Sequence, residues 1–185
     1  EADTPQLKGA GALKVGILRY ILCNFNEAQK AFSSATDNAD RSYFQGLCCK
    51  QLRRYPQALE FFQRAKDQGG KTTELDVEIA EVQALSGNLE AAAKSLARLE
   101  KNIANTADYF YLKGLIDELS GNTLAAGEAY VRAHEISPEH VAATFRLAYF
   151  YDLHGQEEEA VELYRRCISK PPVHASALMN LAVLY

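Results

Sequence analysis

The chain has 185 residues, 48% of them hydrophobic, and a formal net charge of −4. This composition excludes an intrinsically disordered chain, and the charge excludes the strongly basic domain typical of nucleic-acid binding. No apolar run approaches the roughly 20 residues that cross a bilayer, so we expect no contact with membranes.

Helical patterns follow one another in pairs from residue 9, after a polar lead-in over residues 1–8. The predicted pairs are 9–22 with 26–36, 39–52 with 55–68, 73–86 with 89–102, 107–120 with 123–136, and 141–154 with 157–170. A further first helix is predicted over 175–185. Because its apolar face has no partner helix, we expect the natural protein to continue.

Capping residues predict several helix boundaries. Glycines that suit the position after a helix are Gly69, Gly87, Gly121 and Gly155. Asn24, with Glu27 three residues later, approximates a capping box at the second helix. Ser137 before Pro138 predicts the start of the ninth helix, since proline is favoured at the first helical position behind a serine cap. Pro171 and Pro172 should close the fifth pair.

One column of alanines organises the pairs. It consists of Ala58, Ala92, Ala126 and Ala160, at intervals of 34 residues. Four residues beyond each alanine stands a bulky residue: Phe62, Leu96, Tyr130 and Tyr164. Columns that stay in phase at such a period predict a helical solenoid. The first step, from Ala28 to Ala58, is only 30 residues, so the second helix should be about one turn shorter at its end.

These columns resemble the tetratricopeptide repeat (TPR), a unit of two antiparallel helices. The resemblance implies an all-α fold, a right-handed α-α superhelix built as one array over 9–185. Its repeats would be about 9–38, 39–72, 73–106, 107–140, 141–174 and the first helix of a sixth at 175–185. The repeat at 73–106 departs most from the family pattern, because Asp76 stands at a large apolar position.

The stretch KPPVHASALMNLAVLY (170–185) carries a second and weaker resemblance. It is similar to the end of a TPR segment in a bacterial family, where such repeats precede a domain related to the C-terminal domain of the RNA polymerase alpha subunit. This resemblance implies a TPR module within a larger protein that has a transcription-related domain.

The TPR resemblance implies that the first helices line a concave groove while the second helices face outward. The groove-facing places that could bind a partner are Tyr20, Asp40, Tyr43, Glu74, Glu81, Asp108, Tyr111, Glu118, Phe145, Tyr149 and Asp152. The six acids among them face one base, Lys50, so a peptide with basic and apolar residues should fit. The aromatics have two open interpretations, contact with a ligand or packing between first helices.

Residues for catalysis are not arranged in any recognisable motif. His134, His140, His154 and His174 map to helix ends and turns, where a surface or capping role is expected. The cations of the carboxylate-binding clamp of some TPR proteins are replaced at the matching places by Leu13, Tyr43, Val77, Tyr111 and Phe145. We therefore expect neither an enzyme nor a carboxylate clamp.

Cysteine spacing predicts neither a disulfide framework nor a zinc site. Cys48 and Cys49 are neighbours in a predicted helix, where adjacent side chains point about 100° apart. We expect reduced, partly buried thiols in a reducing compartment, and hence a cytoplasmic protein that holds no metal or cofactor.

The sequence thus predicts a protein-interaction scaffold that binds a peptide or partner protein. Three alternatives remain: a TPR module of a larger protein with a transcription-related or catalytic domain outside this chain, a nucleic-acid reader, and self-association through the terminal helix. An acidic groove argues against the nucleic-acid reader, because phosphates require basic side chains.

Overall fold

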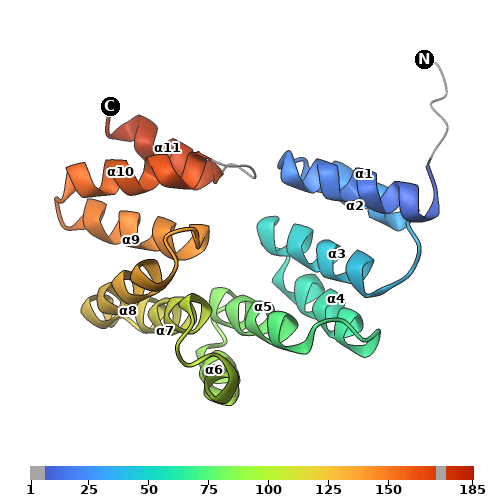
Figure 1. Ribbon diagram of the computed structural model, residues 1–185, viewed down its shortest axis with the longest axis horizontal. Helices are drawn as coiled ribbons and strands as arrows, with labels where there is room; N and C mark the ends of the chain where they lie inside the picture. Colours follow the sequence, from blue (N-terminus) through green and yellow to red (C-terminus); the bar gives the residue numbers. More distant parts are fainter. Residues whose placement is uncertain (1–6, 170–173) are drawn as a thin grey trace. The chain divides into compact units, whose positions relative to one another are not determined.

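The computed structural model describes residues 7–169 and 174–185, and within those ranges it contains helices and no strand. The helices are α1 Gly9–Ile21, α2 Phe25–Ser33, α3 Ala39–Gln51, α4 Tyr55–Asp67, α5 Thr72–Leu85, α6 Leu89–Ile103, α7 Ala107–Leu119, α8 Thr123–Ile136, α9 Val141–Leu153, α10 Glu157–Ile168 and α11 Ala175–Val183 (Figure 1). Most of the predicted lead-in and the pair Pro171–Pro172 lie outside the described residues.

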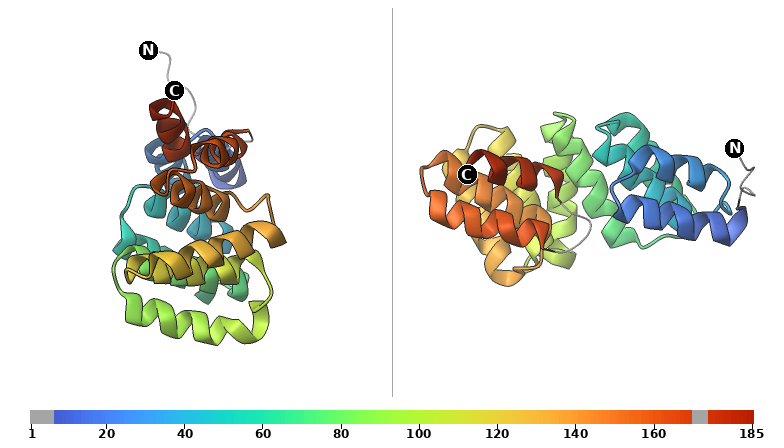
Figure 2. Two further views of the ribbon diagram at one scale, coloured as in Figure 1. Left: turned by 90° about the vertical axis from the view of Figure 1, so that its left-hand side faces the viewer. Right: turned by 90° about the horizontal axis from the view of Figure 1, so that it is seen from above.

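The chain divides into two compact bodies, each described here by itself. The N-terminal body is Glu1–Val82 and the C-terminal body is Gln83–Tyr185, so the division falls within α5. In the first body α1 packs on α2 and α3 on α4; in the second α7 packs on α8 and α9 on α10. Figure 2 shows α9 and α10 side by side as one of these helical hairpins. One continuous array over 9–185 stays a prediction.

Helix boundaries agree closely with the pattern of the sequence. The shortening of the first repeat is confirmed, because α2 has 9 residues whereas α4 has 13. The predicted range 141–154 is confirmed at its start, since α9 begins at Val141, but the predicted Ser137–Pro138 cap was wrong. Ser137 is the C-cap of α8 and Pro138 lies in the turn that follows, while His140 is the N-cap of α9 and accepts the backbone N–H of Ala143.

Asparagines precede several of the helices, but only some of them cap the helix through the side chain. Asn24 is the N-cap residue of α2, but its side chain makes no capping hydrogen bond, so the capping box is absent. Asn88 does cap α6, accepting from the backbone N–H of Ala91. Asn122 precedes α8 without a side-chain cap. Helix starts here therefore depend more on the preceding turn than on the cap.

A recurrent turn ends the helices that lead into these starts. After α3 the N–H of Arg53 donates to Lys50 O at 3.0 Å, and that of Arg54 to Cys49 O at 2.8 Å. These are the two bonds of a Schellman motif, and the same pair ends α1, α4, α5, α7 and α9. The motif needs one residue at positive φ, which is glycine in four of the turns but Cys23 (φ 59°) and Arg53 (φ 56°) in the first two hairpins.

The alanine column forms the core of the hairpins. Ala58, Ala92 and Ala160 are fully buried, and Ala126 is 1% exposed. Small residues opposite the column make room for its aromatics. A Cβ on Gly46 would lie 2.5 Å from the ring of Phe62, so the close approach of α3 and α4 requires glycine there.

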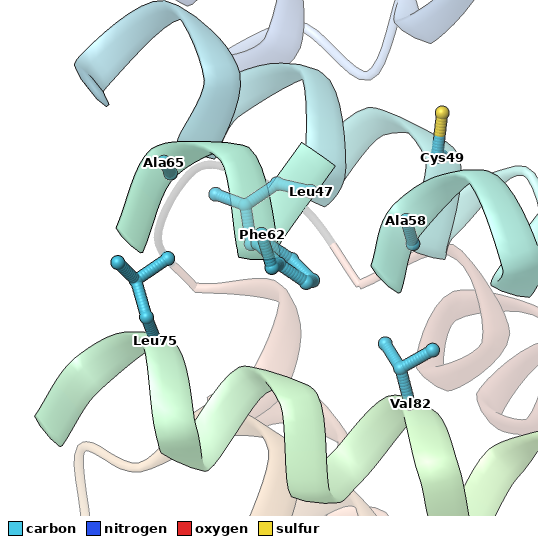
Figure 3. Packing of buried hydrophobic residues seen from close by; sticks show 7 residues of the cluster. All are labelled: Leu47, Cys49, Ala58, Phe62, Ala65, Leu75 and Val82. Atoms are coloured by element: carbon cyan, nitrogen blue, oxygen red, sulfur yellow. The ribbon is translucent and has the colours of Figure 1, made fainter. Parts of the chain in front are cut away.

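Phe62 also connects its hairpin to the next helix. Figure 3 shows Leu75 and Val82 pointing from α5 toward the helices that carry Phe62 and Leu47, and all four belong to one buried cluster. Asp76, which stands at a large apolar position of the family pattern, forms an ion pair: Lys66 Nζ of α4 lies 2.6 Å from Asp76 Oδ1. An ion pair thus stands where the family pattern has an apolar contact.

Candidate functional site

The first helices of the hairpins carry the residues predicted to bind a partner. They are α1, α3 and α5 in the N-terminal body, and α7, α9 and α11 in the C-terminal body. We call their exposed and half-buried side chains the first-helix surface. Each of the two bodies carries its own part of this surface.

Tyr20 and Tyr43 lie in an aromatic cluster of the N-terminal body. Tyr20 contacts Phe25 and Phe44 at ring-centroid distances of 5.7 and 6.0 Å, and Tyr43 contacts Phe44 and Phe62. Burial raises the pKa of Tyr20 to about 12, and it is also the main cause of the raised pKa of Tyr43. Both are half-buried, so packing accounts for much of each ring.

A buried ionic cluster joins α3 to α5. Lys50 Nζ lies 2.5 Å from Glu78 Oε2 and 2.7 Å from Glu81 Oε2. Burial opposes the Lys50 ammonium, yet these two carboxylates hold its pKa well above its usual range. Glu81 is therefore neutralised internally, and it is less available to a ligand than the sequence suggested.

The other two acids of this body are exposed. Asp40 lies in the first turn of α3, and Glu74 in the first turn of α5. Glu74 Oε1 is 2.9 Å from Lys71 Nζ, but both side chains are more than half exposed. Exposed pairs of this kind contribute little energy, so Glu74 remains available to a ligand.

Histidines cover two of the predicted aromatic contacts in the C-terminal body. Tyr111 is only 4% exposed, and the His140 ring lies 5.1 Å from it. The His174 ring stacks on Phe145 at 4.1 Å. Both aromatics therefore favour the interpretation as packing residues, whereas Tyr149 is 37% exposed.

The same two histidines cap helices through their ring nitrogen Nδ1. His140 Nδ1 accepts the N–H of Ala143 at 3.0 Å, and His174 Nδ1 accepts that of Ala177 at 3.2 Å. His140 Nε2 lies 3.0 Å from Asp108 Oδ1, so this predicted groove acid has an internal partner too. Burial is the main cause that lowers the pKa of His174.

Glu118 of α7 forms hydrogen bonds with side chains of both α8 and α9. It accepts from Tyr130 Oη at 2.6 Å and from Arg146 Nη1 at 2.8 Å. Burial, then the Glu118 charge, raises the pKa of Tyr130. Asp152 accepts from Tyr164 Oη at 3.1 Å.

A repeated contact between successive first helices was missed in the sequence, although its signal was there. Lys50 pairs with Glu78, and Glu118 pairs with Arg146, each across 28 residues. Lys50 and Glu118 stand in one column of the repeat, and Glu78 and Arg146 stand in another. Opposite charges in these two columns would have been enough to predict both ion pairs.

Reactive chemistry has little support in the described part of the chain. Burial raises the pKa of both the Cys48 and Cys167 thiols to about 12. Within residues 7–169 and 174–185, no group of three or more metal-ligating side chains gathers, and no helix is long and apolar enough to cross a membrane.

A family model described as the tetratricopeptide repeat matches residues 23–71 and 120–171, more than half of the chain. The chain belongs to the tetratricopeptide repeat family. The gap between the two matches contains the TPR unit at 73–106, which departs most from the pattern. TPR units are generally non-catalytic, so membership indicates a protein–protein interaction scaffold. No sequence among the curated proteins matches the chain.

Solved structures confirm the all-α TPR solenoid fold. TTC0263, a thermophilic TPR protein of Thermus thermophilus, aligns with a TM-score of 0.70 at 19% identity, over 94% of this chain and 97% of that chain. YrrB, a TPR protein with an unusual peptide-binding site, aligns with 0.53 at 18% identity, over 92% and 90%.

The complex Cut9–Hcn1 of the APC/C provides a third alignment. It has a TM-score of 0.68 at 14% identity, over 99% of this chain and 37% of that chain. At these identities the likeness concerns the fold alone. The comparisons do not support the weaker resemblance of 170–185 to the bacterial family with an RNA polymerase alpha-like domain, and residues 170–173 lie outside the described part.

Proposed function

We propose that this TPR chain is a non-catalytic scaffold that binds an extended or helical segment of a partner protein on its first-helix surface. The observation that carries the proposal is the burial of the alanine column. It commits the inner faces of the second helices to packing, while the first helices carry exposed acidic and aromatic side chains such as Asp40, Glu74 and Tyr149.

The partner segment should combine basic and apolar residues. Internal partners reduce the acidity of this surface at Glu81 and Glu118, but Asp40 and Glu74 are exposed. Complementary charge of this kind contributes to the association rate and to specificity more than to affinity. The same proposal places the protein in the cytoplasm, where its cysteine thiols would stay reduced.

A peptide array followed by calorimetry tests this function. Basic-apolar peptides should be enriched, and their affinity should fall as the Debye length shrinks from about 30 Å at 0.01 M salt to 3 Å at 1 M. Changing Tyr43→Ala with Tyr149→Ala should weaken binding, whereas Glu60→Gln on α4 is the control. Enrichment of acidic peptides, or binding unaffected by the double change, would refute the assignment.

A further inference from the structure

The ion pair of Glu118 with Arg146 provides a template for the corresponding place one repeat later. The two side chains are 26% and 20% exposed, and they join the last turn of α7 to the middle of α9. Tyr130 donates to the same carboxylate. A carboxylate at this place can therefore accept hydrogen bonds from a phenol and a guanidinium together.

Thirty-four residues on, the carboxylate and phenol are retained but the cation is not. Asp152 follows Glu118, Tyr164 follows Tyr130, and Asn180 stands where Arg146 stood. Tyr164 Oη donates to Asp152 Oδ2 at 3.1 Å, and Asn180 Nδ2 donates to Tyr164 Oη at 2.8 Å. In the part of the chain that the structure describes, Asp152 forms no ion pair.

Apolar side chains are exposed on the helix face next to this carboxylate. Tyr149 and Leu153 are 37% and 62% exposed, and they lie three residues before Asp152 and one after it, at the same end of α9. On α11, Val183 is 84% exposed, three residues beyond Asn180. The equivalent of Tyr149 in the preceding repeat, Leu115, is fully buried, so α7 does not share this exposure.

We propose that Asp152 binds an arginine side chain of the partner segment, while Tyr149 and Leu153 contact apolar residues next to that arginine. The guanidinium would take the place that Arg146 occupies at Glu118. Two N–H groups directed at one carboxylate give the charge-assisted geometry that arginine favours. The inference rests on the proposed function, and it narrows the partner to an apolar segment with a central arginine.

Two synthetic peptides test this site in the intact chain. One is a capped peptide with arginine between two leucines on each side; in the other, neutral citrulline replaces the arginine. Titration followed by NMR or calorimetry should show about tenfold tighter binding of the arginine peptide, as charge-assisted bonds predict. Asp152→Asn should abolish that difference, because the amide still accepts from Tyr164 but carries no charge.

Glu157→Gln, an equal loss of charge at the exposed start of α10, is the control and should leave the tenfold difference intact. Leu153→Ala should weaken both peptides alike. Equal binding of the two peptides, or a difference that persists in Asp152→Asn, would overturn the arginine site while the wider scaffold function stands.

Binding of neither peptide would overturn the site, and the peptide array would then decide the scaffold function independently. A dimer of the chain that forms through α11 and that the arginine peptide does not dissociate would assign the surface to a second copy. That result would also overturn the proposal.

Discussion

Replacing Arg53 by glycine should stabilise the protein. Arg53 has a φ of 56°, in the left-handed region, and it follows the C-cap residue of α3. An L-residue there costs about 1–2 kcal/mol, whereas the greater freedom of glycine in the unfolded chain costs about 0.5–1 kcal/mol. The difference predicts that Arg53→Gly raises the free energy of unfolding by about 0.5–1 kcal/mol.

Urea unfolding followed by far-UV circular dichroism measures this change. Two variants provide controls. Glu60→Gly, on the exposed face of α4, should destabilise by about 0.5–1 kcal/mol. Gly121→Ala, at a φ of 87°, should destabilise by about 1 kcal/mol because it introduces the same strain. A midpoint for Arg53→Gly that falls along with that of Glu60→Gly would refute the account of the turn.

Three further predictions concern the core and the polar contacts. Ala126→Leu should lower the free energy of unfolding by about 1–3 kcal/mol, since the site is 1% exposed and a larger side chain would overpack it. An unchanged thermal midpoint would contradict the assignment of the alanine column to the core. Lys50→Met should lower it by about 3 kcal/mol, because the largely buried carboxylates of Glu78 and Glu81 lose their ion pairs with Lys50; adding Glu78→Gln and Glu81→Gln should restore much of the loss in the same urea assay. The folded-state pKa of His174 lies below its ordinary value of 6.5, so its contribution to stability is complete above pH 6.5 and is lost as pH falls further. Hydrogen exchange of α11 should therefore accelerate on acidification. The variant His174→Asn should reduce this pH dependence.

Much of the fold was predictable because it depends on period. Helix boundaries follow from columns that recur every 34 residues, and the short α2 follows from the 30-residue first step. The Ser137–Pro138 cap of α9 was mispredicted because serine can precede a proline in a turn as well as a proline at the first helical position. A capping role was expected for His140 as one of two possibilities, but serine is the commoner cap and was assigned to this helix.

The candidate site was predictable by position but not by environment. Columns place Tyr111 and Tyr149 on first helices alike, yet one is 4% exposed and the other 37%. The His140 ring of the next hairpin covers Tyr111, and the periodicity alone did not reveal this contact. Such contacts depend on three-dimensional packing, which a helical period alone does not describe.

Mapping a bound peptide tests the central claim most directly. An isotope-labelled chain titrated with an array-selected basic-apolar peptide should show NMR shift changes concentrated on α1, α3, α5, α7, α9 and α11, and largest at exposed residues such as Tyr149. Shift changes concentrated on the second helices α2, α4, α6, α8 and α10 would contradict the claim that the first helices bind the partner.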